Sequence, residues 1–202
     1  MKKIFHLVAV AALVGLMSNA SYATNIALNA NVTLNGTFFT DDFGWSGGKA
    51  SPASRIVNGT FAKEETQWNT DGVWWNGGEY RNNNIVINLN GKYTIDSFTV
   101  QADDNDTYRV LYMDSQGNWV DAYDVPYQPS YGLVTRPTLT LSTPIVTDAL
   151  EFVATGGDGF YSVSQIEADG SPASNVPEPS TIVLLGLGLA GLVGRQFRRK
   201  SC

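Results

Sequence analysis

The stretch Ile85-Val86-Ile87-Asn88-Leu89-Asn90-Gly91-Lys92-Tyr93-Thr94-Ile95 decides the fold class of this 202-residue chain. It contains a short apolar run, an Asn-Gly pair and a second segment rich in apolar residues. Asn-Gly pairs adopt the positive φ angles that two-residue hairpin turns require. The stretch therefore predicts strands at residues 85–89 and 93–102, joined by a hairpin-type turn. The expected core residues of the second strand are Tyr93, Ile95, Phe98 and Val100.

The same two-residue periodicity runs from residue 24 to residue 169, without a convincing helical stretch. Apolar segments separated by polar turns recur along this region, and Asp114-Ser115-Gln116-Gly117 is one such turn. The further strands are expected at residues 26–34, 108–113, 119–123, 133–141, 145–153 and 161–168. About eight short strands of this kind predict an all-β domain, a single jelly-roll β-sandwich.

The first 23 residues have the features of a secretory signal peptide. Met1-Lys2-Lys3 is a positive start, residues 4–17 are apolar, and Ser21-Tyr22-Ala23 places small residues where a signal peptidase cleaves. A first membrane helix is the weaker reading, because the apolar run is short and is followed by polar residues. We therefore expect signal peptide 1–23, an exported domain at 24–170 and a linker at 171–175.

The C-terminal tail has three parts in a fixed order. Val176, Pro177, Glu178 and Pro179 form an extended motif, since the two prolines cannot join a helix or a central strand. An apolar span at 181–194 follows, expected to be helical and membrane-inserted, and then a basic segment at 195–200 on the cytoplasmic side. The span reaches about 21 Å against about 30 Å of hydrocarbon, which suits a transient anchor better than a permanent one.

This tail resembles the PEP-CTERM sorting signal. The resemblance implies export through the inner membrane of a Gram-negative bacterium, with signal peptidase and an exosortase as processing partners. The protein would then reside in the cell envelope, at the cell surface or outside the cell. An ordinary C-terminal anchor is the alternative, because it would share the span and the basic flank.

Charge and composition exclude several classes of function for the exported region. It contains seven basic and 18 acidic residues, a net charge of −11, so nucleic acid is an unfavourable partner. The chain's single histidine and single cysteine, His6 and Cys202, lie outside it. This excludes Ser-His-Asp and Cys-His catalysis, zinc held by His or Cys, and an internal disulfide.

Several short motifs resemble the discoidin-like galactose-binding domains. They are Ile56-Val57-Asn58-Gly59-Thr60, Trp68, Trp74-Trp75, the segments 85–89 and 93–95, Tyr108-Arg109-Val110-Leu111-Tyr112, Gly117-Asn118-Trp119 and residues 163–170. The resemblance implies a jelly-roll sandwich with a structural calcium ion, for which Asn58 and Thr60 would supply loop oxygens and Glu167 would close the site. Asn58 stands where the family usually has Asp, which would weaken the site. A plain Asn-Gly turn with a solvated Glu167 is the alternative.

Aromatic residues concentrate in a segment rich in Gly and Asn, which is a mixture suited to sugars. Aromatic faces stack on sugar C–H surfaces, and amide, carboxylate and guanidinium groups bond hydroxyls. Two adjacent Trp on a strand point to opposite faces, so we expect at most one of Trp74 and Trp75 in the core and the other exposed. The predicted ligand-binding residues are Trp74, Trp75, Tyr80, Arg81, Asp103, Asp104 and Asn105, with Trp45, Tyr127 and Tyr131 as further residues of the same rim.

Alternatives remain for these residues. Asp103-Asp104-Asn105 can equally be a solvated turn, and Trp68 and Trp119 are expected to be structural. A glycosidase needs two carboxylates placed across a cleft, and nothing in the sequence pairs Asp41, Asp42, Glu64, Glu65 or Glu79 in that way. We therefore expect a non-enzymatic protein that binds extracellular polysaccharide, in a biofilm matrix. The alternatives are a structural or adhesive matrix protein that binds other proteins, and a glycan hydrolase.

Overall fold

The computed structural model describes residues 23–36, 39, 50–76 and 83–173. Its contacts divide the chain into Met1–Ser171 and Pro172–Cys202, and the fold described below belongs to the first unit. Residues 1–22 of the predicted signal peptide, the predicted sorting signal and Trp45, Tyr80 and Arg81 lie outside the described ranges.

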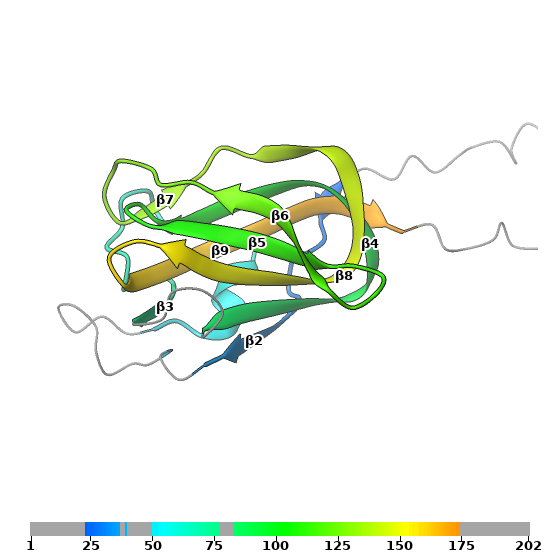
Figure 1. Cartoon of the computed structure of the whole chain (residues 1–202). Helices are drawn as coiled ribbons and strands as arrows, with labels where there is room; N and C mark the ends of the chain where they lie inside the picture. The colour runs from blue at the N-terminus through cyan, green and yellow to red at the C-terminus, as the bar shows by residue number, and fades with distance from the viewer. Residues whose placement is uncertain (1–22, 37–38, 40–49, 77–82, 174–202) are drawn as a thin grey trace, which may run out of the picture. The chain divides into compact units, whose positions relative to one another are not determined.

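The described residues form an all-β domain in which the strands pair antiparallel (Figure 1). The only helical element among them is the short 3-10 turn η2 (Ala53–Val57), and none of their helices is long and apolar enough to cross a membrane. The all-β prediction is therefore confirmed. The strands are β1 (Thr24–Asn25), β2 (Asn31–Asn35), β3 (Val73–Asn76), β4 (Asn84–Asp103), β5 (Thr107–Met113), β6 (Trp119–Val125), β7 (Leu133–Thr135), β8 (Leu139–Gly156) and β9 (Phe160–Pro172).

Two long strands, β4 and β8, carry the chain around the corners of the sandwich. The first part of β4 lies between β2 and β8, with Ile87 opposite both Val32 and Leu150. Its later part pairs with the first part of β8 and then, at residues 101–103, with β7. The pairing of β4 with β8 shifts register between Asn88 and Tyr93 and again between Ile95 and Ser97. Such bulges let one strand pass from one sheet of a sandwich to the other.

The predicted hairpin at Asn90-Gly91 is wrong. Both segments that flank this pair hydrogen-bond to β8 rather than to each other, and the pair lies at the bulge within β4. Asn90 has a φ of 59°, so the pair does adopt the left-handed conformation that the sequence indicated. A bulge and a two-residue turn use the same conformation, and only the long-range partner distinguishes them.

Two other predicted strands have different limits. The segment predicted at 133–141 is divided at Arg136-Pro137-Thr138 into β7 and the start of β8, because proline has no N–H for the ladder. The segment predicted at 26–34 begins instead with a turn, in which the Asn25 side chain accepts a hydrogen bond from the Ala27 N–H at 3.1 Å. The remaining predicted strands lie within β5, β6, β8 and β9.

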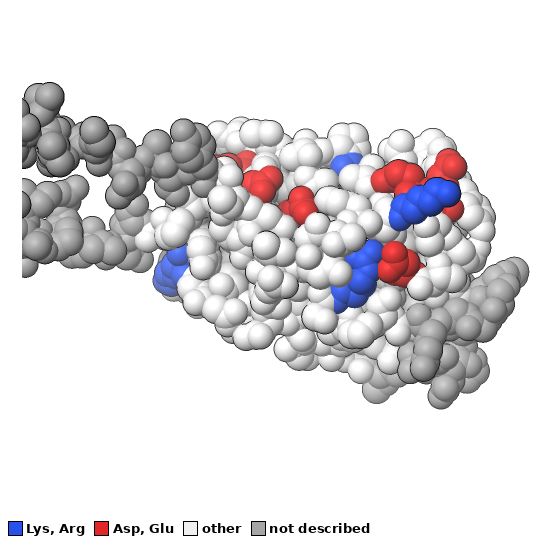
Figure 2. Space-filling view, turned by 180° about the vertical axis from the view of Figure 1, so that it is seen from behind, with Lys and Arg blue, Asp and Glu red and all other residues white. Residues whose placement is uncertain are grey.

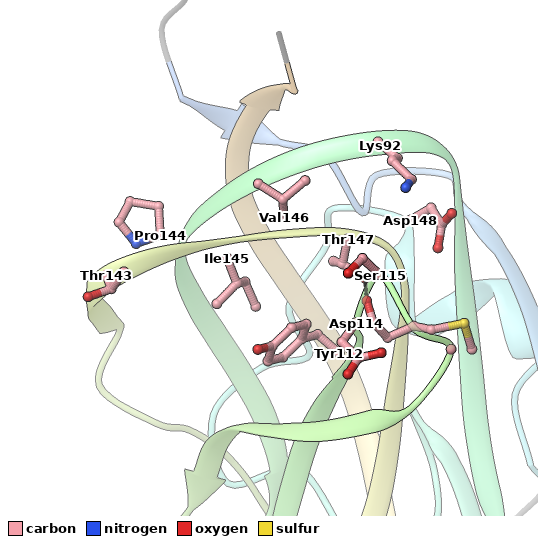
Figure 3. A pocket seen from close by; sticks show the side chains of 12 residues that line it. Lys92, Tyr112, Asp114, Ser115, Thr143, Pro144, Ile145, Val146, Thr147 and Asp148 are labelled. Atoms are coloured by element: carbon pink, nitrogen blue, oxygen red, sulfur yellow. Dashed lines mark hydrogen bonds between the residues drawn. The ribbon is translucent and has the colours of Figure 1, made fainter. Parts of the chain in front are cut away.

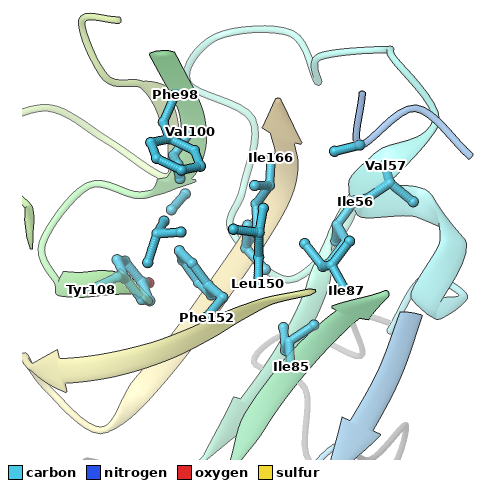
Figure 4. Close-up of a cluster of buried hydrophobic side chains, with 14 of the residues drawn as sticks. Ile56, Val57, Ile85, Ile87, Phe98, Val100, Tyr108, Leu150, Phe152 and Ile166 are labelled. Carbon is cyan, nitrogen blue, oxygen red and sulfur yellow. The ribbon is translucent and has the colours of Figure 1, made fainter. Parts of the chain in front are cut away.

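The hydrophobic core fills the space between the two layers (Figure 4). Ile95, Phe98 and Val100 are buried as predicted, and Tyr93 packs at the edge of the core. The Tyr108 ring stacks on Phe152 with their centroids 5.0 Å apart. Burial of these side chains stabilises the sandwich and fixes the ends of the strands, from which the loops project.

Candidate functional site

Four segments meet at one end of the sandwich and form a surface that we call the rim: residues 64–68, 104–106, 126–132 and 157–160. They connect or precede strands at the end of the domain opposite the C-terminal end of β9, which is drawn in orange (Figure 1). The Gln128 N–H donates to the Asp104 carbonyl oxygen at 2.9 Å, and the Leu133 N–H donates to the Thr66 carbonyl oxygen at 2.8 Å. These backbone bonds hold three of the four segments together.

Exposed aromatic side chains gather on the rim. The large apolar side chains most exposed in the described part of the chain are Leu28, Tyr127, Tyr131, Val146 and Phe160, and three of these five belong to the rim. Tyr131 is 56% exposed and Tyr127 is 53% exposed, while Phe160 is 37% exposed and lies 5.9 Å from Trp68 between ring centroids. The Tyr131 hydroxyl donates to Gln67 Oε1, so its exposed ring is held in one orientation.

Polar groups lie between these aromatic side chains. The Asn105 amide donates to Asp158 Oδ2 at 3.0 Å, and Asp158 Oδ1 accepts from the Phe160 N–H at 2.9 Å. Asp104 is nearly buried, and its Oδ2 accepts from the Ser130 N–H at 3.4 Å. The side chains of Asn105 and Asp158 are exposed, so their unused donor and acceptor positions face solvent.

Arg136 anchors the rim from below. Its buried guanidinium donates to four main-chain carbonyl oxygens, which belong to Ala102, Asp103, Pro126 and Val134. Burial lowers the pKa of Arg136, and the nearby Tyr108, Tyr123, Asp103 and Asp104 oppose that shift. The end of β4 and the loop that carries Tyr127 and Tyr131 are thereby fixed to each other.

Two buried aspartates lie beneath the exposed groups of the rim. Burial, and next the neighbouring charge of Asp106, raise the pKa of Asp103 to about 8. Burial also raises the pKa of Asp106 to about 7, although its carboxylate accepts from the Tyr108 hydroxyl at 2.9 Å. In the described residues no group of three or more His, Cys, Asp or Glu side chains is placed to hold a metal ion. Because the pKa values of Asp103 and Asp106 are raised in the folded state, their protonation is coupled to the stability of the domain.

These pKa values predict that the domain loses stability as pH rises. A carboxyl group with a raised pKa in the folded state stabilises the fold fully below its unfolded pKa of about 4, and that contribution is lost as pH rises through its folded pKa. We expect the urea midpoint to fall between pH 5 and about pH 8. Asp106→Asn places a neutral amide, which can still donate and accept hydrogen bonds, at this position. It should therefore make the urea midpoint depend less steeply on pH. An equally steep curve for this variant would contradict the assignment.

The structure corrects the prediction that one of Trp74 and Trp75 is exposed. Both side chains are 0% exposed, on opposite faces of β3. Trp75 packs in the core against Tyr161 at 5.6 Å between ring centroids, and the edge of Trp68 covers Trp74 at 5.6 Å. The sequence did not indicate that the second face of β3 is also covered. Asp103 and Asp104 are also buried, whereas the neighbouring Asn105 is exposed.

The loop proposed for calcium contains a different cation. Arg55 Nη1 donates to Asn58 Oδ1 at 3.3 Å, to the Ser164 carbonyl oxygen at 3.1 Å and to the Thr60 carbonyl oxygen. From β9, the residue that faces the loop is Gln165, whose amide, suitably oriented, accepts from the Gly59 N–H at 3.1 Å. Among the described residues no hydrogen bond joins Glu167 to Asn58 or Thr60. Burial raises the pKa of Glu167, which lies two residues, about 6–7 Å, further along the strand. In this arrangement the oxygens do not fit a calcium ion.

A groove lies at the other end of the sandwich, with a volume of about 710 Å³. Lys92 and Asp148 lie at one end of it, with Thr143 and Pro144 at the other, and Tyr112 is its one aromatic side chain (Figure 3). Val146 is its most exposed apolar residue. The rim presents more aromatic surface than this groove. The groove is the alternative location for a ligand.

Comparison with known proteins agrees with the two resemblances found in the sequence. Residues 175–200 match the PEP-CTERM protein-sorting motif, which confirms the predicted sorting signal and indicates export and sorting to the cell surface. No curated protein matches the chain.

Solved structures similar to the domain include three sugar-binding proteins. A fucolectin from striped bass (Morone saxatilis) serum matches with a TM-score of 0.53 and 12% identity, over 74% of this chain and 50% of the fucolectin chain. The family 32 carbohydrate-binding module of Clostridium perfringens NanJ, solved with galactose, gives a TM-score of 0.49 and 13% identity over 73% of this chain and 98% of that module. A chitosan-binding module from Paenibacillus sp. IK-5 matches with a TM-score of 0.47 and 18% identity, over 72% of this chain and 98% of that module. The predicted β-sandwich fold is confirmed.

Proposed function

We propose that the domain is a non-catalytic carbohydrate-binding module and that the rim is its binding surface. The observation that carries the proposal is the Tyr131 ring, which is 56% exposed and held by a hydrogen bond to Gln67. A ring fixed in this way loses little conformational freedom when a sugar stacks on it. Tyr127, Phe160 and the polar groups of Asn105 and Asp158 extend the surface beyond one sugar unit.

The charge of the domain favours neutral or amino-bearing polysaccharides. Of the basic residues described, Arg55 and Arg109 form ion pairs with aspartates and Arg136 is buried. Figure 2 shows one face of the molecule, on which much of the surface is uncharged and basic side chains adjoin acidic ones near one end. With a net charge of −11 in the exported region, a uronic-acid polymer would be repelled.

The sorting signal supports a location where such a ligand occurs. We infer that an exosortase removes the tail after export across the inner membrane of a Gram-negative bacterium, and that the domain then binds exopolysaccharide at the cell surface or in the matrix. The carboxylates of the rim are engaged within the domain, which supports binding rather than hydrolysis. Main-chain N–H groups donate to Glu64, Asp104, Asp106 and Asp158, and the Ser130 hydroxyl donates to Glu65.

Affinity electrophoresis of the purified protein tests this proposal. We expect galactan, a neutral polymer, and chitosan, an amino-bearing polymer, to retard the protein when they are entrapped in the gel, and alginate, an anionic polymer, to leave its mobility unchanged. Retardation by alginate alone, or by none of the three polymers, would contradict it and favour the matrix protein that binds other proteins.

A further inference from the structure

The loop after η2 surrounds a cation that belongs to the chain itself. The Arg55 guanidinium forms a two-pronged ion pair with Asp71, Nε to Oδ1 at 2.7 Å and Nη2 to Oδ2 at 3.1 Å. Its remaining nitrogen, Nη1, faces three neutral oxygens of Asn58, Thr60 and Ser164. The N–H groups of Arg55 thus bind four separate positions of the chain.

The charges around this position match a monovalent cation. Calcium sites in proteins use six to eight oxygens, commonly with carboxylates among them. Here Asp71 is the one carboxylate bonded to Arg55, and the side chains that approach the loop oxygens from both sides, Asn58 and Gln165, are neutral amides. One carboxylate neutralises the single positive charge of a guanidinium. Beside a divalent ion, one carboxylate would leave a net positive charge of one.

The guanidinium also joins segments in the way that a structural metal does. It links η2 and the loop after it to the residues before β3 and to the middle of β9. The Arg55 side chain is only 11% exposed, whereas that of Asp71 is 45% exposed. Charge-assisted hydrogen bonds with limited exposure are among the stronger polar contacts in proteins.

We propose that Arg55 occupies a cation site of the fold, and that it holds the Asn58–Thr60 loop closed without a metal ion. The domain therefore needs no calcium for stability, unlike a domain in which the same loop coordinates the ion. The proposal concerns the loop alone and is independent of what the rim binds.

The response of the wild-type protein to calcium tests the proposal first. Calorimetric melting of the purified protein in excess CaCl2 and in excess EDTA should give the same Tm. A Tm that rises in CaCl2 would overturn the proposal, because a ligand that binds the folded state raises its stability. This measurement needs no variant and remains decisive if a substitution prevents folding.

Removal of the charge tests whether Arg55 holds the loop. Arg55→Met keeps the apolar stem and should lower Tm by roughly 3–12 °C, from the loss of charge-assisted hydrogen bonds. Arg109→Met is the matched control, since Arg109 pairs with Asp121 and Asp124, whose side chains are largely exposed, and should change Tm by roughly 0–4 °C. Equal effects of the two substitutions would overturn the role of Arg55.

Restoring negative charge tests whether the position is a cation site. The variant Arg55→Met, Asn58→Asp, Gln165→Glu replaces the internal cation with two added carboxylates beside Asp71. We expect its Tm to rise in CaCl2 relative to EDTA, and isothermal titration to show calcium binding that the wild type lacks. A folded variant without any calcium response would show that these oxygens do not form a cation site.

Discussion

Trp75→Ala is expected to remove a large part of the stability of the domain. The Trp75 side chain is 0% exposed and lies among Phe39, Tyr108 and Tyr161, with ring centroids 5.3, 6.3 and 5.6 Å away. Truncation of a buried Trp to Ala costs about 3–5 kcal/mol, because the surrounding side chains cannot close the cavity. Domains have only about 5–15 kcal/mol of stability in total. The expected result is a large fall in the urea midpoint, followed by far-ultraviolet circular dichroism.

The matched control for Trp75→Ala is Trp119→Ala. Trp119 is the first residue of β6 and is partly exposed, so its truncation should cost less and leave the protein folded. The order of the two urea midpoints checks the burial of both residues. A Trp75→Ala protein that unfolds at the wild-type midpoint would contradict the packing described here.

Replacing both Tyr127 and Tyr131 with alanine is expected to abolish most polysaccharide binding while leaving stability nearly unchanged. Both side chains are more than half exposed, so little core packing is lost. If each ring contributes about 1–2 kcal/mol to binding, the double variant loses roughly 30- to 700-fold in affinity. Titration calorimetry with the polymer that retards the wild type measures this loss, and thermal melting measures stability.

Two further variants separate the causes of that loss. Tyr131→Phe keeps the ring but removes its hydrogen bond to Gln67, so it should weaken binding less than Tyr131→Ala. Val146→Ala removes an equally exposed apolar side chain from the groove at the opposite end and should leave affinity unchanged. If Val146→Ala weakens binding more than the double tyrosine substitution does, the ligand lies in that groove.

The sequence predicted the positions of the strands better than it predicted which strands pair with each other. Alternation of apolar residues identified the segments that form β5, β6 and β9, because that pattern depends on neighbours along the same strand. The corner in β4 was mistaken for a hairpin, since Asn90-Gly91 fits both and only the pairing with β8 decides between them. The β-sandwich fold and the sorting tail, both predicted partly from short motifs, were confirmed by comparison.

The site was predicted less completely, and the reason is again long-range contact. Residue type alone suggested Asp104, Asn105, Tyr127 and Tyr131 as candidates. It did not suggest Asp158 and Phe160, because the contact of Asp158 with Asn105 joins residues 53 positions apart. Burial of both Trp74 and Trp75 depends on side chains from β9 and from the segment before β3. The contact of Arg55 with the Asn58–Thr60 loop could have been suspected from the sequence. Arg55 is one of few basic residues in an acidic domain and lies three positions before Asn58.

Backbone amide NMR of the protein, titrated with the oligosaccharide that binds it, locates the binding surface residue by residue. If the rim binds the sugar, chemical-shift changes concentrate at residues 104–106, 126–132 and 157–160, with little change at Lys92, Asp114 or Asp148. Changes centred on those last three residues, or no saturable change with any neutral or amino-bearing oligosaccharide, would contradict binding at the rim.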